Sequence, residues 1–332
     1  MSTKLKLLEI FSQREGEYLS GQELANALGL SRNAIWKAIK NLQEQGFQIE
    51  TKPATGYRLI KKGDVLSKDY IEESLPFPAK VHILQSVDST NDFAKRLTDV
   101  TIPNIIIAEE QSKGRGRLGR HFHSPISKGL YMTVAFEPDF DLDKAMFVTT
   151  ISALSVCHAI EKITGIGPKI KWVNDIYYNG KKICGILTEA ESNFETGKIS
   201  KIILGVGINC FPQEFPEELS EKATYIENPL YDFSRNRLAV EIINEFYNLL
   251  REFDKKKILR EYKSRSLLLG EHILIYGTSY SSLPEHGGKG VKARAIDIDE
   301  SGGLVVEYLE GRRAREMDVI TSGEVSIRKD PF

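Results

Sequence analysis

The sequence predicts an α+β protein of several domains: a helical domain with a β-hairpin, a central mixed β-sheet backed by helices, and a small C-terminal β domain. The chain has 332 residues, which is more than one typical hydrophobic core contains. Its apolar residues follow helical spacing at the N-terminus, mixed spacing in the centre and alternation near the C-terminus. We therefore predict domains at 1–63, 81–270 and 271–332, with a linker at 64–80.

The composition argues against several classes of protein. No apolar run approaches the ~18 residues of a membrane helix, and the apolar part of the N-terminus is too short for a signal peptide. Cys157, Cys184 and Cys210 lie far apart without a C-x-x-C pair, which argues against structural zinc and a disulfide framework. We expect buried thiols in a cytoplasmic protein that does not associate with membranes, and we assign no residue as a metal ligand.

The N-terminal domain has the pattern of a winged helix. Ser20 and Glu23 form a capping box for a helix that ends at Gly29. Ser31 caps the next helix, whose apolar residues repeat at helical spacing and whose outer face is basic. Two helices joined by a short turn are typical of a helix-turn-helix, and the alternating residues 46–60 predict the wing.

Positive charge gathers in this domain. Residues 31–62 hold seven lysines and arginines against two glutamates, although the net charge of the whole chain is −1. A DNA backbone suits such a surface. We therefore assign DNA binding to the outer face of the third helix and to the wing: Ser31, Arg32, Asn33, Trp36, Lys37, Lys40 and Arg58. A small helical domain that binds protein is the alternative.

In the central segment, strands are expected at 81–87, 104–111, 129–137 and 201–210, with a hairpin over 170–191 that turns at Asn179-Gly180. Helices are expected over 88–98, from Asp141–Asp143 to Gly165, and over 234–253. The C-terminal segment has alternating runs at 271–277, 291–299, 303–309 and 324–329, which predict a small barrel or sandwich. The sequence assigns no role to the loop at 277–290.

The segment 111–120 combines three glycines and four cations without a carboxylate. Glycine lets backbone amides close around an anion, and arginine forks suit phosphate and carboxylate. No GK[ST] follows, so this is not a Walker A loop. Because the segment lies between two strand-like runs, we expect a ligand-binding loop that stays mobile until an anion neutralises it. A solvated basic turn is the alternative.

Other polar groups occur at the expected strand ends. Residues 89–91 open a helix, residues 171–175 contain Lys171, Asn174 and Asp175, and Lys182 follows the hairpin turn. An ordinary helix cap and a solvated lysine are the structural alternatives. Gly205 and Gly207 lie within a strand, where glycine costs stability unless another group approaches the backbone closely.

Together these groups suggest a site for an acid and a nucleoside triphosphate. Formation of an acyl adenylate requires an in-line approach of carboxylate to the α-phosphate, with cations on the developing charge. Arg115, Arg117, Arg120 and Lys182 are suitable cations. No Ser-His-Asp or Cys-His arrangement stands out, and the His121/His123 pair lacks further metal ligands.

The segments GRGRLGR, KWVNDIYYNGKKICGIL and GVGIN, with the winged helix, resemble the bacterial bifunctional biotin–protein ligases, which also repress biotin-synthesis operons. The resemblance covers essentially the whole chain. It implies a class II synthetase-like ligase domain and an SH3-like C-terminal domain. It also implies that biotin and MgATP form biotinyl-5′-AMP, and that a lysine of a biotin carboxyl carrier domain then takes the biotin.

The resemblance implies roles for individual residues. Catalytic roles are implied for Arg115, Arg117, Asp175 and Lys182. Biotin contacts are implied for Ser89, Thr90, Asn91, Gln111, Gly114, Arg115, Lys182, Gly185 and Leu187. Nucleotide contacts are implied for Arg117, Arg120, Phe122, Asn174, Asn209 and Arg235. Two positions depart from the family pattern, since Leu118 replaces an arginine of some members and Phe122 a tryptophan of many.

In that family, ordering of the loops by biotinyl-5′-AMP favours a homodimer, which places two winged helices on a two-fold symmetric operator. Biotinyl-5′-AMP is thus both intermediate and corepressor. Two alternatives remain open. One is a transcription factor that senses biotin or lipoate without ligating it. The other is a ligase whose winged helix contacts protein only.

Overall fold

The computed structural model describes residues 3–14, 16–44, 47–53, 55–61, 64–193, 195, 198–226, 234–276, 290–321 and 324–327. The chain divides into two compact units. The first comprises residues 1–67 with 234–236, and the second comprises residues 68–233 with 237–332. Residues 277–289 of the long C-terminal loop lie outside the described ranges.

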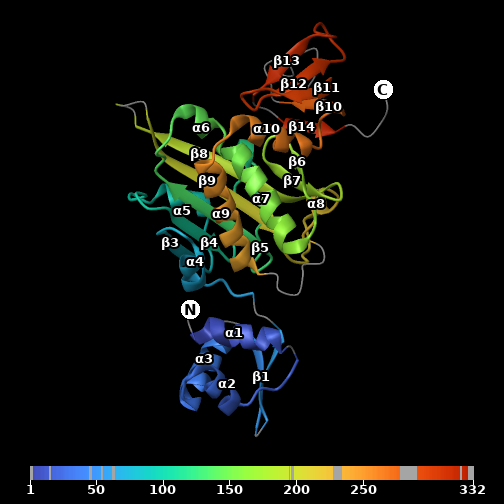
Figure 1. Cartoon of the computed structure of the whole chain (residues 1–332). Coiled ribbons are helices and arrows are strands. Elements are labelled where there is room, and N and C mark those ends of the chain that lie inside the picture. The colour runs from blue at the N-terminus through green and yellow to red at the C-terminus, as the bar shows by residue number, and fades with distance from the viewer. Residues whose placement is uncertain are drawn as a thin grey trace. The chain divides into compact units, whose positions relative to one another are not determined.

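The first unit consists of three helices and a β-hairpin (Figure 1). Its elements are α1 (Thr3–Gln13), α2 (Gly21–Leu28), α3 (Arg32–Glu44), β1 (Gln48–Lys52) and β2 (Gly56–Lys61). The predicted caps are present, since the Ser20 hydroxyl accepts a hydrogen bond from the backbone of Glu23 and the Ser31 hydroxyl accepts one from the backbone of Ala34. Gly29 ends α2 with a φ of 65°, which glycine adopts without strain.

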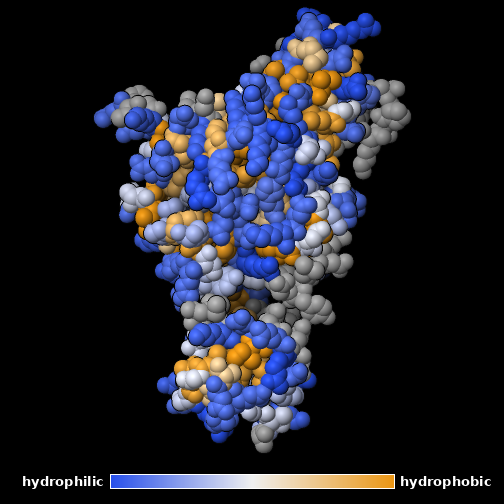
Figure 2. All heavy atoms as spheres, viewed as in Figure 1, coloured by the Kyte–Doolittle hydropathy of each residue, from blue (hydrophilic) through white to orange (hydrophobic). Residues whose placement is uncertain are grey.

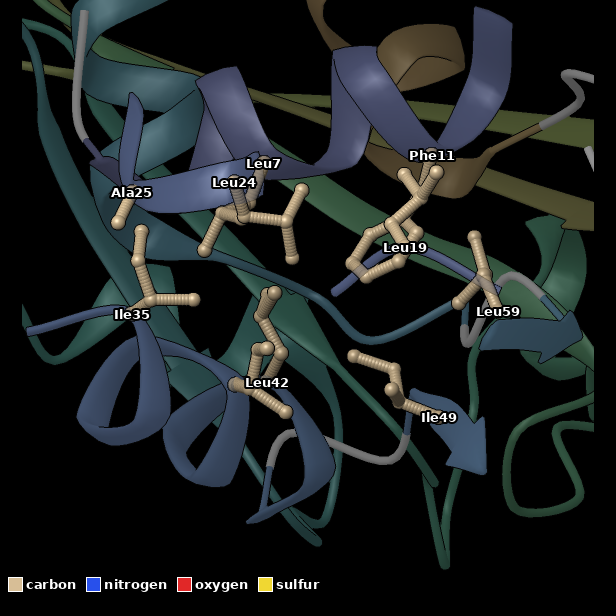
Figure 3. Close-up of a cluster of buried hydrophobic side chains, with 10 residues drawn as sticks. Leu7, Phe11, Leu19, Leu24, Ala25, Ile35, Leu42, Ile49 and Leu59 are labelled. Carbon is tan, nitrogen blue, oxygen red and sulfur yellow. The ribbon is translucent and has the colours of Figure 1, made fainter. Parts of the chain in front are cut away.

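Buried side chains from all three helices and both strands form the core of this unit. Figure 3 shows them pointing toward one another: Leu7, Phe11, Leu19, Leu24, Ala25, Ile35, Leu42, Ile49 and Leu59. Burial of each large aliphatic or aromatic side chain contributes roughly 1.5–3 kcal/mol. The helical spacing of these residues therefore fixes the inner face of each helix, and the basic residues of α3 are left outside.

The second unit contains a seven-stranded mixed sheet in the order β3-β4-β5-β9-β8-β7-β6. Its strands are β3 (Lys80–Leu84), β4 (Asn104–Ala108), β5 (Gly129–Phe136), β6 (Lys169–Lys171), β7 (Asp175–Tyr178), β8 (Lys181–Ser192) and β9 (Ile199–Asn209). Strands β3 and β4 are parallel, and the remaining neighbours are antiparallel. The predicted Asn179-Gly180 turn joins β7 to β8 with positive φ at both residues.

Helices cover both faces of this sheet (Figure 1). They are α4 (Lys68–Ser74), α5 (Thr90–Lys95), α6 (Leu142–Met146), α7 (Val148–Thr164), α8 (Glu217–Ser220), α9 (Arg235–Arg251) and α10 (Lys255–Ser264). The hydroxyl of Thr149 on α7 bonds that of Thr188 on β8, whereas Asn91 of α5 bonds the next residue, Glu189. Because successive side chains of a strand point to opposite faces, α5 and α7 lie on opposite sides. Figure 2 shows that the outer surface of α7 and α9 is mostly hydrophilic.

The C-terminal part of the second unit is a five-stranded antiparallel sheet in the order β13-β12-β11-β10-β14. Its strands are β10 (His272–Tyr276), β11 (Val291–Ile298), β12 (Leu304–Tyr308), β13 (Met317–Ile320) and β14 (Glu324–Ile327). The indole N–H of Trp172 donates to the carbonyl of Gly302 at 2.9 Å, which attaches the turn before β12 to the residue following β6. This confirms a small β unit, while its closure into a barrel stays a prediction.

Three sequence predictions of secondary structure need correction. The single helix expected from Asp141–Asp143 to Gly165 is two helices, because Phe147 ends α6 and its buried ring packs against Phe253. Helix α10 was not predicted, although Asp254 caps it. Strand β13 was also missed, because its apolar residues Met317 and Val319 are exposed and Ile320 is its one buried residue.

The three cysteines are buried, and none forms a disulfide, as predicted. Burial raises the pKa of the Cys157 thiol to about 12 and that of Cys184 well above its ordinary value. These thiols are therefore unreactive. Among the described helices, none is both long and apolar enough to cross a bilayer.

Glycine at position 205 lets α5 approach the sheet. A Cβ placed on Gly205 would lie 2.2 Å from Oδ1 of Asn91, which is closer than atoms pack. Asn91 is itself held by the Thr133 hydroxyl and by Glu189. A glycine within a strand predicts that another group approaches the backbone closely. At Gly205 that group is the side chain of Asn91.

We predict that Gly205→Ala destabilises the protein by about 1–3 kcal/mol, because the new methyl group must displace Asn91 from its hydrogen bonds. Urea unfolding checks this. Gly167→Ala is the matched control, since only Glu161 comes near its Cβ, at 4.0 Å. Equal unfolding midpoints for the two variants would contradict the packing described for Asn91.

His158 of α7 joins two other helices. Its Nδ1 lies 3.3 Å from Glu245 of α9, and its Nε2 lies 2.5 Å from Glu261 of α10. Burial alone would raise the pKa of Glu261, but the hydrogen bond and charge of His158 hold it below the ordinary value of 4.5. The ionised Glu261 is therefore favoured in the folded state.

We predict that acidification lowers the free energy of unfolding partly because it protonates the Glu261 carboxylate. When folding lowers the pKa of a carboxyl group, the ionised group stabilises the fold at any pH above its pKa in the unfolded state. This stabilisation is lost as the pH falls from that pKa through the lower pKa of the folded state. The midpoint temperature of thermal unfolding should therefore fall less for Glu261→Gln than for the wild type between about pH 5 and pH 3. Glu252→Gln, at an exposed position, is the control. Parallel profiles for Glu261→Gln and wild type would refute the role of this carboxylate.

Candidate functional site

The glycine-rich basic segment forms a closed turn beside the start of α5. Its beginning is fastened by bonds from the backbone of Ser112 to Val87 and of Lys113 to Asp88, at 2.9 and 2.7 Å. Its end returns through a 2.8 Å bond from the Phe122 amide to the Gly114 carbonyl. The tip, Arg117–Gly119, is one 3₁₀ turn in which Leu118 is 71% exposed with a φ of 55°. The backbone of this loop is therefore folded back on itself.

A row of uncharged polar groups lies between this loop and the sheet. The carbonyl oxygen of the Gln111 side chain accepts bonds from the backbone and hydroxyl of Thr90, at 2.9 and 3.0 Å. The Gln111 amide donates to the Ser124 hydroxyl at 2.9 Å. The hydroxyl of Thr133 lies 2.8 Å from that of Thr90 and 2.7 Å from Oδ1 of Asn91. These residues form one continuous chain of hydrogen bonds, suited to a ligand with neutral polar groups.

A charged group occupies the other end of the same face. Nζ of Lys182 lies 2.6 Å from Oδ1 of Asp175, and both side chains are partly exposed, at 31% and 23%. Arg117 donates to Oδ1 of Asn174 at 3.2 Å, and the Asn174 amide donates to the carbonyl of Ile186 at 2.7 Å. Lysine and arginine are thus held side by side by oxygen acceptors, where an anionic ligand can replace those acceptors.

Phe122 covers the sheet between these two ends. A Cβ on Gly207 would lie 2.7 Å from its ring, and a Cβ on Gly185 would lie 3.4 Å from it. A Cβ on Gly114 would collide with the Phe122 carbonyl and the Ser124 hydroxyl. The packing of the loop onto the sheet therefore excludes a side chain at Gly114 and Gly207, whereas a Cβ at Gly185 would require only a small shift of the flexible Lys182 side chain.

Arg115 lies at the uncharged end, where two carboxylates balance it. Its Nη1 is 2.6 Å from Asp92 and 3.7 Å from Glu189, and the bond to Asp92 raises the pKa of the guanidinium. Lys95 lies 2.9 Å from Glu189 and 3.4 Å from Asp92. Burial alone would raise the pKa of Glu189, but its bonds from Lys95 and Asn91 lower it. The two cations and two carboxylates leave this end without net charge.

The structure thus brings most of the predicted site residues onto one sheet face: Ser89, Thr90, Asn91, Gln111, Gly114, Arg115, Arg117, Phe122, Asn174, Asp175, Lys182, Gly185, Leu187 and Asn209. Ser89 caps α5 and is buried, and the Asn209 amide donates to the carbonyl of Thr224 at 2.9 Å. Arg120 belongs to the loop, where its carbonyl accepts from the amide of Gly116.

Arg235 is placed differently, because it belongs to the first unit. Its side chain is 1% exposed and forms an ion pair with Asp64, which also accepts from the Arg235 backbone at 2.7 Å. Asp64 therefore caps the first turn of α9. The nucleotide contact implied for Arg235 stays a prediction.

Sequence reasoning missed five residues of the site: Asp92, Lys95, Ser124, Thr133 and Glu189. Thr133 carried a signal, because it is a polar residue within the apolar strand run 129–136, whereas Glu189 lies in the mostly polar run 188–192 and carried none. Asp92 and Lys95 are an ordinary helical pair in the sequence, and nothing in the pattern connects them with Arg115.

Within the described ranges, no three His, Cys, Asp or Glu side chains are grouped to hold a metal ion. Mg²⁺ commonly binds through one or two carboxylates together with substrate phosphates. Asp175 beside Lys182 offers one such carboxylate.

Three of the seven predicted DNA-binding residues line a groove of about 460 Å³ in the first unit. The groove is lined by Arg32, Asn33 and Trp36 of α3, by the start of α2 and by the β1–β2 turn. Trp36 is 45% exposed, with the Lys40 ammonium 4.9 Å from its ring. Arg58 is bonded to Glu50 at 2.6 Å, so its charge is partly balanced within the hairpin.

Family models match three parts of the chain. Residues 3–58 match an HTH domain, residues 83–209 match the Biotin/lipoate A/B protein ligase family, and residues 283–328 match the Biotin protein ligase C terminal domain. The crystal structure of a biotin protein ligase from Aquifex aeolicus in complex with biotin and ATP is similar, with a TM-score of 0.60 and 30% identity. That similarity covers 76% of this chain and 99% of the Aquifex chain.

Two curated relatives extend the similarity to both units. The bifunctional ligase/repressor BirA of Bacillus subtilis is 33% identical over 92% of this chain and 94% of its own length. The bifunctional ligase/repressor BirA of Escherichia coli is 30% identical over 79% of this chain and 80% of its own length. With a helix-turn-helix unit and the ligase sheet in one polypeptide, the chain belongs to the family of bifunctional biotin ligase/repressors.

Proposed function

We propose that this protein activates biotin with ATP and transfers it to a lysine of a biotin carboxyl carrier domain. The observation that carries the proposal is the division of one sheet face into an end without net charge, where hydroxyl and amide groups form a chain of hydrogen bonds, and an end with two cations, Lys182 and Arg117, and one carboxylate, Asp175. Biotin has the matching division, since its ring system carries a neutral ureido group and its side chain ends in a carboxylate.

In the first step, a carboxylate oxygen of biotin attacks the α-phosphorus of ATP, and pyrophosphate leaves. Lys182 and Arg117 supply positive charge where negative charge develops. In the second step, the carrier lysine attacks the carbonyl carbon of biotinyl-5′-AMP, an amide bond forms and AMP leaves. Asp175, which accepts from Lys182, is the carboxylate that we assign to hold the attacking amine or accept its proton.

Mg²⁺ is the cofactor that this chemistry implies, and it would neutralise the leaving pyrophosphate. The residues fit such an ion in a limited way. Asp175 is an oxygen ligand at the charged end, so phosphate oxygens would supply most of the coordination.

We predict that Lys182→Met lowers the rate of carrier biotinylation by roughly 10²–10³-fold with little change in thermal stability, because it removes charge stabilisation from the first step. Mass spectrometry of the carrier domain gives the rate, and release of pyrophosphate separates the two steps. Lys181→Met is the matched control, since Lys181 is the adjacent residue and bonds the Ser220 carbonyl at the surface.

Three outcomes bear on the proposal. A wild-type protein that binds biotin but releases no pyrophosphate would instead be a sensor. Greater activity with lipoate than with biotin would show that lipoate is the preferred substrate. Equal losses of biotinylation rate in the Lys181 and Lys182 variants would contradict the role proposed for Lys182.

We further propose that the first unit binds the operator of biotin-synthesis genes as part of a liganded homodimer, with biotinyl-5′-AMP as corepressor and the cytoplasm as its location. The helix-turn-helix match and the bifunctional relatives support this, as does the exposed basic face of α3. An SH3-like closure of the C-terminal sheet belongs to the same proposal, supported by the match to the ligase C-terminal domain.

We predict that Arg32→Ala and Lys37→Ala each weaken DNA binding and reduce the dependence of log K on log salt by about one unit, because each removes a phosphate contact. Gel shifts use DNA from upstream of biotin-synthesis genes, with and without biotinyl-5′-AMP. Lys6→Ala is the control, because Lys6 is exposed but lies on α1, outside α3 and the wing. A shift that is insensitive to biotinyl-5′-AMP would contradict the corepressor role.

A further inference from the structure

We propose that Glu189 makes the site specific for a ligand with N–H donors, because its carboxylate sets the direction of the hydrogen-bond chain that ends at Thr90. The proposal rests on the proposed function in taking biotin as the substrate. Glu189 acts through Asn91 and Thr133, so it is a positioning residue.

The chain of bonds begins at a group that can only accept. Lys95 and Arg115 lie 2.9 and 3.7 Å from Oε1 of Glu189, which keeps this half-buried carboxyl group ionised. An ionised carboxylate has no proton to donate. Its second oxygen, Oε2, lies 2.9 Å from Nδ2 of Asn91.

This contact fixes the orientation of the Asn91 amide. Nδ2 faces two acceptors, the Glu189 carboxylate and the Leu187 carbonyl, the latter at 3.4 Å. Oδ1 must then face Thr133, whose hydroxyl lies 2.7 Å away. Since an amide oxygen cannot donate, the proton of the Thr133 hydroxyl is directed to Asn91.

The other end of the chain is fixed in the same way. The Ser124 hydroxyl donates to the carbonyl of Phe122 at 2.9 Å, so it accepts from Nε2 of Gln111. Oε1 of Gln111 therefore faces Thr90 and accepts from its backbone and its hydroxyl. A backbone carbonyl at one end and a carboxylate at the other thus fix the donors on either side of Thr90, whose single hydroxyl proton has two acceptors, Thr133 and Gln111.

Thr90 is left with the capacity to accept. Its single hydroxyl proton faces two acceptors, Oγ1 of Thr133 at 2.8 Å and Oε1 of Gln111 at 3.0 Å, and is therefore used inside the protein. A ligand that meets this end must bring an N–H or O–H group to the remaining lone pairs of Thr90 and Gln111. The ureido ring of biotin has two N–H donors, and a ligand without them leaves these acceptors unpaired.

Glu189→Gln tests this directly. The new amide can donate to Asn91, which allows the Asn91 amide to turn and the chain to reverse. We expect the Kd for biotin, measured by calorimetry, to rise roughly tenfold, in line with the loss of one hydrogen bond. Affinity for an isosteric analogue with CH₂ in place of both ureido N–H groups should stay the same. Discrimination between the two compounds therefore falls roughly tenfold, while kcat at saturating biotin changes by less than about twofold.

Two further comparisons separate specificity from structure. Glu191→Gln changes a neighbouring carboxylate on β8, paired with Lys201, and should leave discrimination unchanged. Thr133→Val breaks the chain at another point, so it should reduce discrimination as Glu189→Gln does, and the double variant should lose no more than either alone. Thr133→Ser, which keeps the hydroxyl, should restore wild-type discrimination.

The outcomes are distinguishable. If the wild type binds biotin and Glu189→Gln still discriminates equally well between biotin and the analogue, the role of Glu189 is overturned but the proposed function is not. Additive losses in the double variant would do the same. Failure of the wild type to bind biotin would overturn both this inference and the proposed function.

Discussion

The contact between Asn91 and the backbone of Gly205 is the constraint on which the site depends. It brings the start of α5 against β9, so the side chains of Thr90 and Asn91 reach Thr133 on the neighbouring strand. The same approach places Asp92 and Lys95 beside Glu189 on β8. Three strands and one helix are therefore joined by side chains that the ligand site also uses, which links the integrity of the fold to the shape of the pocket.

Charge is separated along this sheet face. Arg115 and Lys95 are balanced by two carboxylates, Asp92 and Glu189, at one end, whereas Lys182 and Arg117 at the other end have one carboxylate between them, because Asp175 pairs with Lys182 and Arg117 donates to the neutral Asn174. Cations that already have carboxylate partners contribute little attraction for a further anion. The number of arginines in the loop is therefore larger than the number of cations free to bind an anionic ligand. The partner that each guanidinium meets on the sheet decides its role.

Local patterns predicted much of the fold. The caps at Ser20 and Ser31, the Asn179-Gly180 turn and the apolar strands depend on residues that are close in sequence, and the structure confirms them. Clustering of Thr90, Gln111, Asn174, Asp175 and Lys182 required the family resemblance, because sheet order is set by long-range pairing. The balancing of Arg115 by Asp92 could not be predicted, since 23 residues separate them and neither forms a motif. The break at Phe147 was not predicted either, and the buried ring of this residue packs against Phe253, which lies far along the chain.

The glycines beneath the site have a consequence for attempts to redesign it. At positions 114, 185, 205 and 207, any side chain meets the loop, Lys182, Phe122 or Asn91. At Gly114, Gly205 and Gly207 even a methyl group displaces a neighbour, so these positions cannot be varied in small steps. A library that seeks new acids for this scaffold should leave these glycines constant and vary the loop tip and the first turn of α5.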